Sequence, residues 1–158
     1  MFWQIIPPMG TPLAANTPFA AAIKEVVDVP VIAVGRIHSP GLAEHIVEKG
    51  QADMVAMGRP LLADPEFVNK ARQGRFDDIT PCISCGIGCI QKRQEMIGMT
   101  CLMNPNTGKE SEPIPDLPQT IKSVMIVGGG PAGLTAARIA SERGHRVILY
   151  EKTDKLGG

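Results

Sequence analysis

The chain has 158 residues, the length of one ordinary domain, and its 16 basic residues balance 16 acidic ones. This balance gives no reason to expect a nucleic acid or an anionic membrane as a partner. Residues 1–23 carry no charge, but four prolines break the stretch and no basic segment precedes it. We therefore expect neither a signal peptide nor a spanning helix, and a cytoplasmic protein whose four cysteines are reduced.

The first half of the chain alternates two apolar runs with two segments that open on a polar residue followed by proline. Apolar β-branched runs predict strands buried on both faces, and Ser-Pro or Asp-Pro pairs are typical of helix starts. The predicted elements are strands at 29–34 and 53–57 and helices at 41–49 and about 64–74, the second opened by Asp64-Pro65. Strand–helix units of this kind are typical of a parallel α/β fold.

A short repeat lies at the carboxyl ends of these two predicted strands. Val34-Gly35-Arg36-Ile37 recurs as Met57-Gly58-Arg59-Pro60, with the two glycines 23 positions apart. Glycine amides together with an arginine fork can hold a flavin phosphate, as at the last two strands of a (β/α)8 barrel. The alternative is that Arg36 and Arg59 merely lie at strand ends on a solvated face, and the sequence leaves both open.

Two histidines lie close to the first Gly-Arg pair. His38 follows the first strand and could face a ligand, whereas His45 lies in the middle of the predicted helix. Without an identified carboxylate partner, neither histidine is assigned a catalytic role.

Four cysteines follow with the spacing C-x2-C-x3-C-x11-C, at Cys82, Cys85, Cys89 and Cys101. Three bunched thiols and one remote thiol suit a cubane iron–sulfur cluster, whereas structural zinc sites usually bring two separate C-x-x-C pairs. A third alternative is a set of buried thiols on one helix face. Pro81, Gly86 and Gly88 oppose a regular helix there, and the glycines leave amides free to approach sulfide.

The last part of the chain predicts a nucleotide-binding βαβ unit. A proline-rich segment over Glu110–Thr120 has the composition of a stiff linker. A strand at 123–127 then leads into Gly128-Gly-Gly-Pro-Ala-Gly133, a helix to about residue 143 and a strand at 146–150. Gly128 suits the tight turn, Gly130 the approach to a pyrophosphate and Gly133 close helix–strand packing, and Glu151 follows where an acidic residue binds ribose hydroxyls.

These features coincide in a known family. Gly58-Arg-Pro-Leu-Leu-Ala-Asp-Pro-Glu-Phe67, Pro81-Cys-Ile-Ser-Cys85 and Val127-Gly-Gly-Gly-Pro-Ala-Gly133 resemble the iron–sulfur flavoenzymes of the old yellow enzyme group. That group includes 2,4-dienoyl-CoA reductase, trimethylamine dehydrogenase and NADH:flavin oxidoreductases. The resemblance runs from about Ile6 to the end of the chain. The three residues between Cys85 and Cys89 make the cysteine spacing more similar to that of the dienoyl-CoA reductases than to that of the amine dehydrogenases.

The resemblance implies an FMN-binding barrel, a 4Fe-4S cluster beside it, and a region that binds FAD and NAD(P)H. Hydride from NAD(P)H would reduce FAD, and electrons would pass through the cluster to FMN, which would reduce an activated alkene or acyl-CoA substrate. Implied FMN ligands are Gly35, Arg36, Gly58 and Arg59. Implied cluster ligands are Cys82, Cys85, Cys89 and Cys101. Implied FAD contacts are Gly128, Gly130, Ala132, Gly133, Glu151 and Gly158.

On this basis we expect three segments. Residues 1–80 would be the C-terminal part of the (β/α)8 barrel, 81–122 the cluster segment and linker, and 123–158 the start of a Rossmann-like domain. A full barrel has eight strand–helix units, so the chain is expected to be an internal piece without a catalytic acid of its own. Strands without their neighbours would expose apolar faces and unpaired edges, which predicts an inactive, aggregation-prone chain.

Two alternatives remain beside the alkene reductase. One is an amine dehydrogenase or demethylase on the same scaffold. The other is a small non-catalytic module that binds a metal and one nucleotide.

Overall fold

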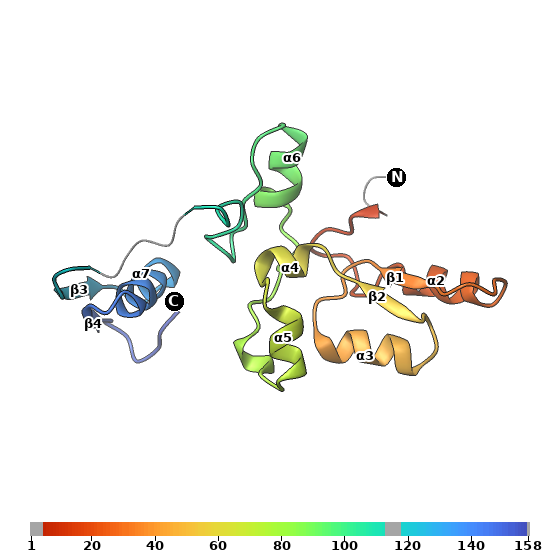
Figure 1. The fold of residues 1–158 in the computed structure, drawn as a ribbon, viewed down its shortest axis with the longest axis horizontal. Helices are drawn as coiled ribbons and strands as arrows, with labels where there is room; N and C mark the ends of the chain where they lie inside the picture. Colours follow the sequence, from red (N-terminus) through yellow and green to blue (C-terminus); the bar gives the residue numbers. More distant parts are fainter. Residues whose placement is uncertain (1–4, 113–117, 158) are drawn as a thin grey trace. The chain divides into compact units, whose positions relative to one another are not determined.

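The computed structural model describes residues 5–112 and 118–157, and it divides into two compact units, Met1–Ser111 and Glu112–Gly158 (Figure 1). Each unit has its own two-stranded parallel sheet. Residues 113–117 of the predicted linker at 110–120 lie outside the described residues. The three predicted segments with boundaries at 80 and 122 stay predictions, whereas the mixed α/β fold is observed.

The first unit is built on one parallel strand pair with a helical crossover. β1 (Ile32–Val34) pairs with β2 (Met54–Ala56), Ile32 opposite Met54 and Val34 opposite Ala56. α3 (Pro40–Glu48) connects them, and α2 (Thr17–Lys24) precedes β1. The remaining elements are α4 (Arg59–Ala63), α5 (Phe67–Arg72), a 3-10 turn at Phe76–Asp78, a π-helical turn at Ile87–Gln91 and α6 (Lys92–Gln94).

The apolar core of this unit lies where α2 and α3 contact the strands. Ala33, Ile37, Ile46 and Ala52 are its most buried members. Ala33 is the one buried residue of β1, between two exposed neighbours. The predicted start of α3 is observed within one residue. The Ser39 side chain accepts a hydrogen bond from the Leu42 amide at 3.3 Å, and Pro40 takes the first helical position.

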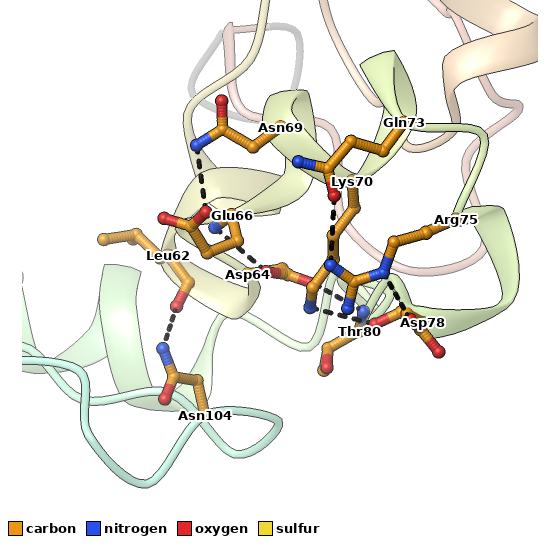
Figure 2. Close-up of polar contacts among 10 residues, drawn as sticks. All are labelled: Leu62, Asp64, Glu66, Asn69, Lys70, Gln73, Arg75, Asp78, Thr80 and Asn104. Atoms are coloured by element: carbon orange, nitrogen blue, oxygen red, sulfur yellow. Dashed lines mark hydrogen bonds and ion pairs between the residues drawn. The ribbon is translucent and has the colours of Figure 1, made fainter.

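The predicted helix over 64–74 is wrong in its start, because the helix observed in this stretch begins three residues later. α4 ends at Ala63, Asp64 lies just beyond it, and α5 begins only at Phe67. The Asp64 carboxylate accepts hydrogen bonds from the amides of Glu66 at 3.0 Å and Thr80 at 2.8 Å (Figure 2). Asp64 therefore joins α4 to a later segment instead of opening a helix.

The cysteine-rich stretch has little regular structure, as its lack of periodicity predicted. Residues 79–86 form no helix or strand, and Gly86 adopts a left-handed conformation with φ +72° before the π-helical turn. Cys89 lies within that turn, and Cys101 follows a bend after α6.

The second unit is a single βαβ unit. β3 (Ser123–Val127) pairs in parallel with β4 (Arg146–Tyr150), Ser123 opposite Arg146, and α7 (Pro131–Glu142) connects them. The predicted strands at 123–127 and 146–150 agree with these bounds. The helix begins directly after the glycine-rich turn, because Pro131 suits a first helical position.

Both sheets carry exposed apolar side chains, as predicted for strands without neighbouring units. Val34 and Met54 are about half exposed on the first sheet, and Met125 and Val127 are more so on the second. Separately, none of the helices in the described part of the chain has both the length and the apolarity that crossing a bilayer requires.

Candidate functional site

The two Gly-Arg pairs meet in one pocket of the first unit. Because β1 and β2 are parallel with Val34 opposite Ala56, the loops after them leave the same sheet edge. Gly35, Arg36, Gly58 and Arg59 all line a cavity of about 180 Å³ there. The sequence pattern thus corresponds to one place in the fold.

Backbone conformation brings the first pair into this pocket. Gly35 has φ +130°, and a Cβ added there would lie 2.9 Å from the Asn16 side chain. Arg36 has φ +52°, in the left-handed region that is costly for a residue with a side chain. The Arg36 carbonyl accepts a hydrogen bond from the Ala14 amide at 3.2 Å, which helps to hold this conformation.

The two arginine side chains are oriented by backbone carbonyls of the N-terminal segment. Arg59 Nη2 donates to the Pro7 carbonyl at 2.7 Å, and Arg36 Nη1 donates to the Thr11 carbonyl. Arg36 Nε is buried and has no hydrogen-bond partner among the described residues. An orphaned guanidinium N–H in a pocket with two positive charges is suited to an anionic oxygen.

His38 lines the same pocket. Burial lowers the pKa of His38, and the charges of Arg36 and Arg59 lower it further. The ring is therefore neutral near pH 7 and can both donate and accept a hydrogen bond. His38 Nε2 lies 3.2 Å from the Ser84 hydroxyl oxygen. His45 lies in α3, and its role stays unassigned.

All four cysteines line one small cavity of the first unit. Cys82, Cys85, Cys89 and Cys101 surround it together with Arg59, and each is partly buried and free of disulfide bonds. The fold therefore brings the remote Cys101 to the three bunched thiols.

A close contact between Gly88 and Thr100 holds the Cys101 segment against the segment of the other three cysteines. The Thr100 amide donates to the Gly88 carbonyl at 2.8 Å, and a Cβ on Gly88 would lie 2.4 Å from the Thr100 carbonyl oxygen. No side chain fits at position 88 without displacing backbone. Thr100 directly precedes Cys101, and Gly88 directly precedes Cys89. The contact between them therefore fixes the distance between the two cysteine segments.

The surroundings of Cys89 affect the pKa of its thiol in opposite directions. Burial raises the pKa of Cys89, and the neighbouring Cys82 and Cys85 raise it further, whereas the Ile90 amide and Arg59 lower it. Three thiolates at this place would repel one another without a cation. The Arg59 guanidinium is the positive group that lines the cavity.

The described residues contain no group of three or more His, Cys, Asp or Glu side chains arranged to hold a metal ion. A structural zinc ion needs four ligands at about 2.0–2.3 Å from one centre. In a cubane each thiolate binds a different iron, so its ligands stand farther apart than those of one zinc. The cluster and zinc alternatives both stay predictions.

The glycine-rich turn of the second unit is closely packed at Gly133 and open at Gly130. Gly128 has φ +101°, and a Cβ on Gly133 would lie 1.9 Å from the Gly128 carbonyl oxygen. A Cβ on Gly130 would meet nothing within 4 Å. Gly133 therefore serves helix–strand packing, while the space around Gly130 at the start of α7 is open to a ligand.

The acidic residue at the end of β4 lies beside this turn. Glu151 Oε2 accepts a hydrogen bond from the Gly129 amide at 2.6 Å, and Oε1 accepts one from the Thr153 amide at 3.0 Å. These hydrogen bonds lower the pKa of Glu151, and the bond from the Gly129 amide has the largest effect. Gly128 and Glu151 line a shared cavity of about 370 Å³, and Ala132 is the second residue of α7. Gly158 lies outside the described residues.

Two residues of the first unit were missed by the sequence analysis. Ser84, between Cys82 and Cys85, and Asp64 both take part in partly buried hydrogen bonds to distant segments. Asp64-Pro65 has the pattern of a helix start, and Ser84 is one of the two variable positions between Cys82 and Cys85. No local pattern signals partners 16 and 46 positions away.

Comparison with known proteins agrees with this geometry. Residues 10–78 match the NADH:flavin oxidoreductase / NADH oxidase family, and residues 126–158 match the NAD(P)-binding Rossmann-like domain. The chain is 51% identical over 142 residues to an NADH oxidase of Thermoanaerobacter brockii, covering 88% of this chain and 22% of that protein. It is 44% identical over 152 residues to a cinnamate reductase of Clostridium sporogenes, covering 96% of this chain and 23% of that protein.

A solved structure agrees in fold as well. The histamine dehydrogenase of Rhizobium sp. 4-9 superposes with a TM-score of 0.81 at 34% identity, covering 96% of this chain and 22% of that one. The chain thus spans about a quarter of the length of the curated relatives it matches. These relatives carry the names of oxidoreductases, and the matches support FMN and NAD(P)H as the family's cofactors. Over residues 10–78 the chain is therefore similar to the NADH:flavin oxidoreductase / NADH oxidase family.

Proposed function

We propose that this chain carries the FMN phosphate site and the 4Fe-4S relay of an NAD(P)H-dependent flavin oxidoreductase that reduces an activated C=C bond. One observation carries the proposal. Arg59 lines the Gly-Arg pocket and also the cavity of the four cysteines. A residue common to both cavities means that a phosphate at the first and a cluster at the second would be neighbours.

The residues of the Gly-Arg pocket fit a flavin phosphate. Arg36 offers a buried N–H without a partner, and Arg59 is held in place by the Pro7 carbonyl. Charge-assisted hydrogen bonds from guanidinium groups to phosphate are short and strong. In the proposal, Gly35 and Gly58 leave the backbone accessible, and the two arginines neutralise the phosphate.

The four cysteines fit a 4Fe-4S cluster in their donor chemistry. An all-thiol set from one loop and one remote residue is the usual ligand set of such clusters. Gly86 and Gly88 keep side chains away from the thiols, and Arg59 adds the positive charge that thiolates need. Cys82, Cys85, Cys89 and Cys101 would each bind one iron.

The second unit fits the ADP part of a dinucleotide, which we assign to FAD. The amide end of α7, a helix of 12 residues, opens at Gly130, where no side chain obstructs a pyrophosphate. Glu151 would exchange its bonds to the Gly129 and Thr153 amides for ribose hydroxyls. Gly128, Ala132, Gly133 and Gly158 would complete the turn around the nucleotide.

When bound, these groups would supply hydride transfer and one-electron transfer, from NAD(P)H through FAD and the cluster to FMN and then to the substrate. This chain's residues hold the groups and orient them. The cinnamate reductase supports an enoate type of substrate. The histamine dehydrogenase supports the second candidate, an amine dehydrogenase or demethylase on the same scaffold.

Flavin binding tests the proposal. The chain would be reconstituted anaerobically with iron and sulfide, and FMN added while its fluorescence is followed. We expect quenching with the unmodified chain, and at least about tenfold weaker binding for Arg36→Gln, since bonds to charged groups are worth 1.5–3 kcal/mol. Arg75→Gln, which removes an exposed ion pair to Asp78, is the control and should bind FMN normally. Equal FMN affinity in Arg36→Gln and the unmodified chain would overturn the phosphate site.

A further inference from the structure

Ser84 lies between Cys82 and Cys85 and is almost completely buried. Only 1% of its surface is exposed, and its φ of +56° places it in the left-handed region. Serine has no intrinsic preference for this conformation, which is costly for any residue with a Cβ. The surrounding contacts must therefore hold it there.

Three hydrogen bonds hold Ser84, each to a different segment. Its amide donates to Cys82 Sγ at 3.4 Å, and its carbonyl accepts from the Met9 amide at 3.1 Å. Its hydroxyl shares a hydrogen bond with His38 Nε2 at 3.2 Å. One residue thus joins the cysteine loop, the N-terminal segment and the loop after β1.

The two ends of the Ser84–His38 bond face different cavities. His38 lines the Gly-Arg pocket, two residues after Arg36. Ser84 lines a neighbouring cavity of about 410 Å³ with Cys85 and Arg59. The bond is therefore a direct side-chain link between the predicted phosphate pocket and the loop that bears two of the predicted cluster ligands.

We propose that Ser84 is a positioning residue, whose hydroxyl bond to His38 sets the conformation of the Cys82–Cys85 turn and couples it to the flavin phosphate pocket. The inference rests on the proposed function for the identity of the two groups. The amide bond to Cys82 Sγ gives the hydroxyl a route to the sulfur, because moving Ser84 moves that donor. Hydrogen bonds to ligand sulfurs tune iron–sulfur clusters.

The simpler alternative is that Ser84 only fills buried space. In that case Ser84→Ala, which removes one oxygen, would leave the cluster and the flavin site unchanged. His38→Leu would then act independently of Ser84→Ala. The two explanations differ in whether the effects of the two substitutions are additive.

The test uses the full chain reconstituted anaerobically with iron and sulfide. Ser84→Ala, His38→Leu and the double variant would be compared by EPR after dithionite and by FMN titration. We expect Ser84→Ala to retain iron, to change the EPR g values, and to bind FMN about three- to tenfold more weakly, the effect of one hydrogen bond. The double variant should bind FMN no more weakly than the weaker-binding of the two single variants.

Two further variants separate positioning from loss of fold. His38→Gln keeps a hydrogen-bonding group near the Nε2 position and should recover most of the FMN affinity that His38→Leu loses. Ile46→Val opens space in the core but lines neither pocket, and it should keep the EPR signal and FMN affinity of the unmodified chain.

The outcomes distinguish the two proposals. If the unmodified chain takes up a cluster and FMN but Ser84→Ala behaves identically, or the two substitutions are additive, the role of Ser84 is overturned while the proposed function stands. If the unmodified chain takes up neither group, the proposed function fails and this inference fails with it.

Discussion

The Asp64 carboxylate accepts a hydrogen bond from the Thr80 amide at 2.8 Å, and Thr80 lies two residues before Cys82 (Figure 2). Asp64 itself is 4% exposed and follows directly after α4. Lys70 Nζ donates to the same carboxylate at 2.6 Å and neutralises its charge. The end of α4 thus anchors the chain that enters the cysteine loop.

The chain beyond Cys101 is anchored to the same short helix. The Leu62 carbonyl accepts hydrogen bonds from Asn104 Nδ2 at 3.0 Å and from Thr107 Oγ1 at 2.8 Å. Figure 2 shows the Asn104 bond beside the Asp64 contacts. α4 begins with Arg59, so one turn of helix joins the Gly-Arg pocket to both cysteine segments.

Asp64→Asn should weaken the first unit and its uptake of iron. The amide cannot neutralise the half-buried Lys70 ammonium, and breaking a buried pair is strongly destabilising. We expect the free energy of unfolding to fall by about 2–3 kcal/mol. Urea unfolding followed by circular dichroism measures this loss, and iron analysis after reconstitution measures the effect on the cysteine loop.

Asp78→Asn is the matched control, because its carboxylate pairs with Arg75 on the surface at 54% exposure. Exposed ion pairs of this kind contribute roughly 0–1 kcal/mol. Equal losses of stability in the two variants would contradict the anchoring role of Asp64.

Acid should weaken the Asp64 anchor selectively. Burial raises the pKa of Asp64, but the bonds from Lys70, Thr80 and Glu66 outweigh it and lower the pKa below its ordinary value. A lowered pKa in the folded chain means that stability is present above the unfolded pKa, about 3.9, and is lost as the pH falls through the lower folded value. The stability difference between the unmodified chain and Asp64→Asn should be constant from about pH 5 to 7 and shrink below about pH 4. A difference that stays constant down to about pH 2 would contradict this assignment.

Gly88→Ala should separate the two cysteine segments. Its methyl group would lie 2.4 Å from the Thr100 carbonyl oxygen, so the backbone must move apart. We expect a loss of about 1–3 kcal/mol and a marked loss of reconstituted iron. Gly98→Ala is the control in the same stretch, because its methyl group would meet nothing within 4 Å. Normal iron uptake by Gly88→Ala would show that the Gly88–Thr100 contact is not needed.

Two glycines of the second unit should respond differently to the same change. Gly133→Ala puts a methyl group 1.9 Å from the Gly128 carbonyl oxygen and should destabilise the βαβ unit by about 3 kcal/mol. Gly130→Ala meets no protein atom within 4 Å and should fold normally but bind ADP more weakly. ADP titration by calorimetry, with thermal unfolding as the fold readout, distinguishes the two. Unchanged ADP binding in a folded Gly130→Ala would contradict a pyrophosphate site there.

The βαβ unit was predictable from sequence because its signals are local. Continuous apolar runs predict β3 and β4, and glycines followed by proline mark the start of α7. The residues of the Gly-Arg pocket were also predictable as a group, since two parallel strands bring their carboxyl ends to one sheet edge. Short-range patterns therefore identified which residues meet in these two places.

The α4–α5 region and the links between loops could not be predicted in the same way. Asp64-Pro65 is typical of a helix start, but the Asp64 carboxylate instead accepts a hydrogen bond from the distant Thr80 amide, and the next helix begins only at Phe67. The Ser84–His38 bond joins residues 46 positions apart. Such contacts depend on how the loops pack, and periodicity and capping rules contain no information about them.

The most direct test of the account is EPR of the chain after anaerobic reconstitution with iron and sulfide and reduction by dithionite, compared with Cys101→Ala. The account predicts the signal of a reduced 4Fe-4S centre in the unmodified chain and its loss in the variant, because Cys101 lines the cavity with the other three cysteines. Zinc uptake without iron by a folded chain, or an unchanged signal in Cys101→Ala, would contradict it.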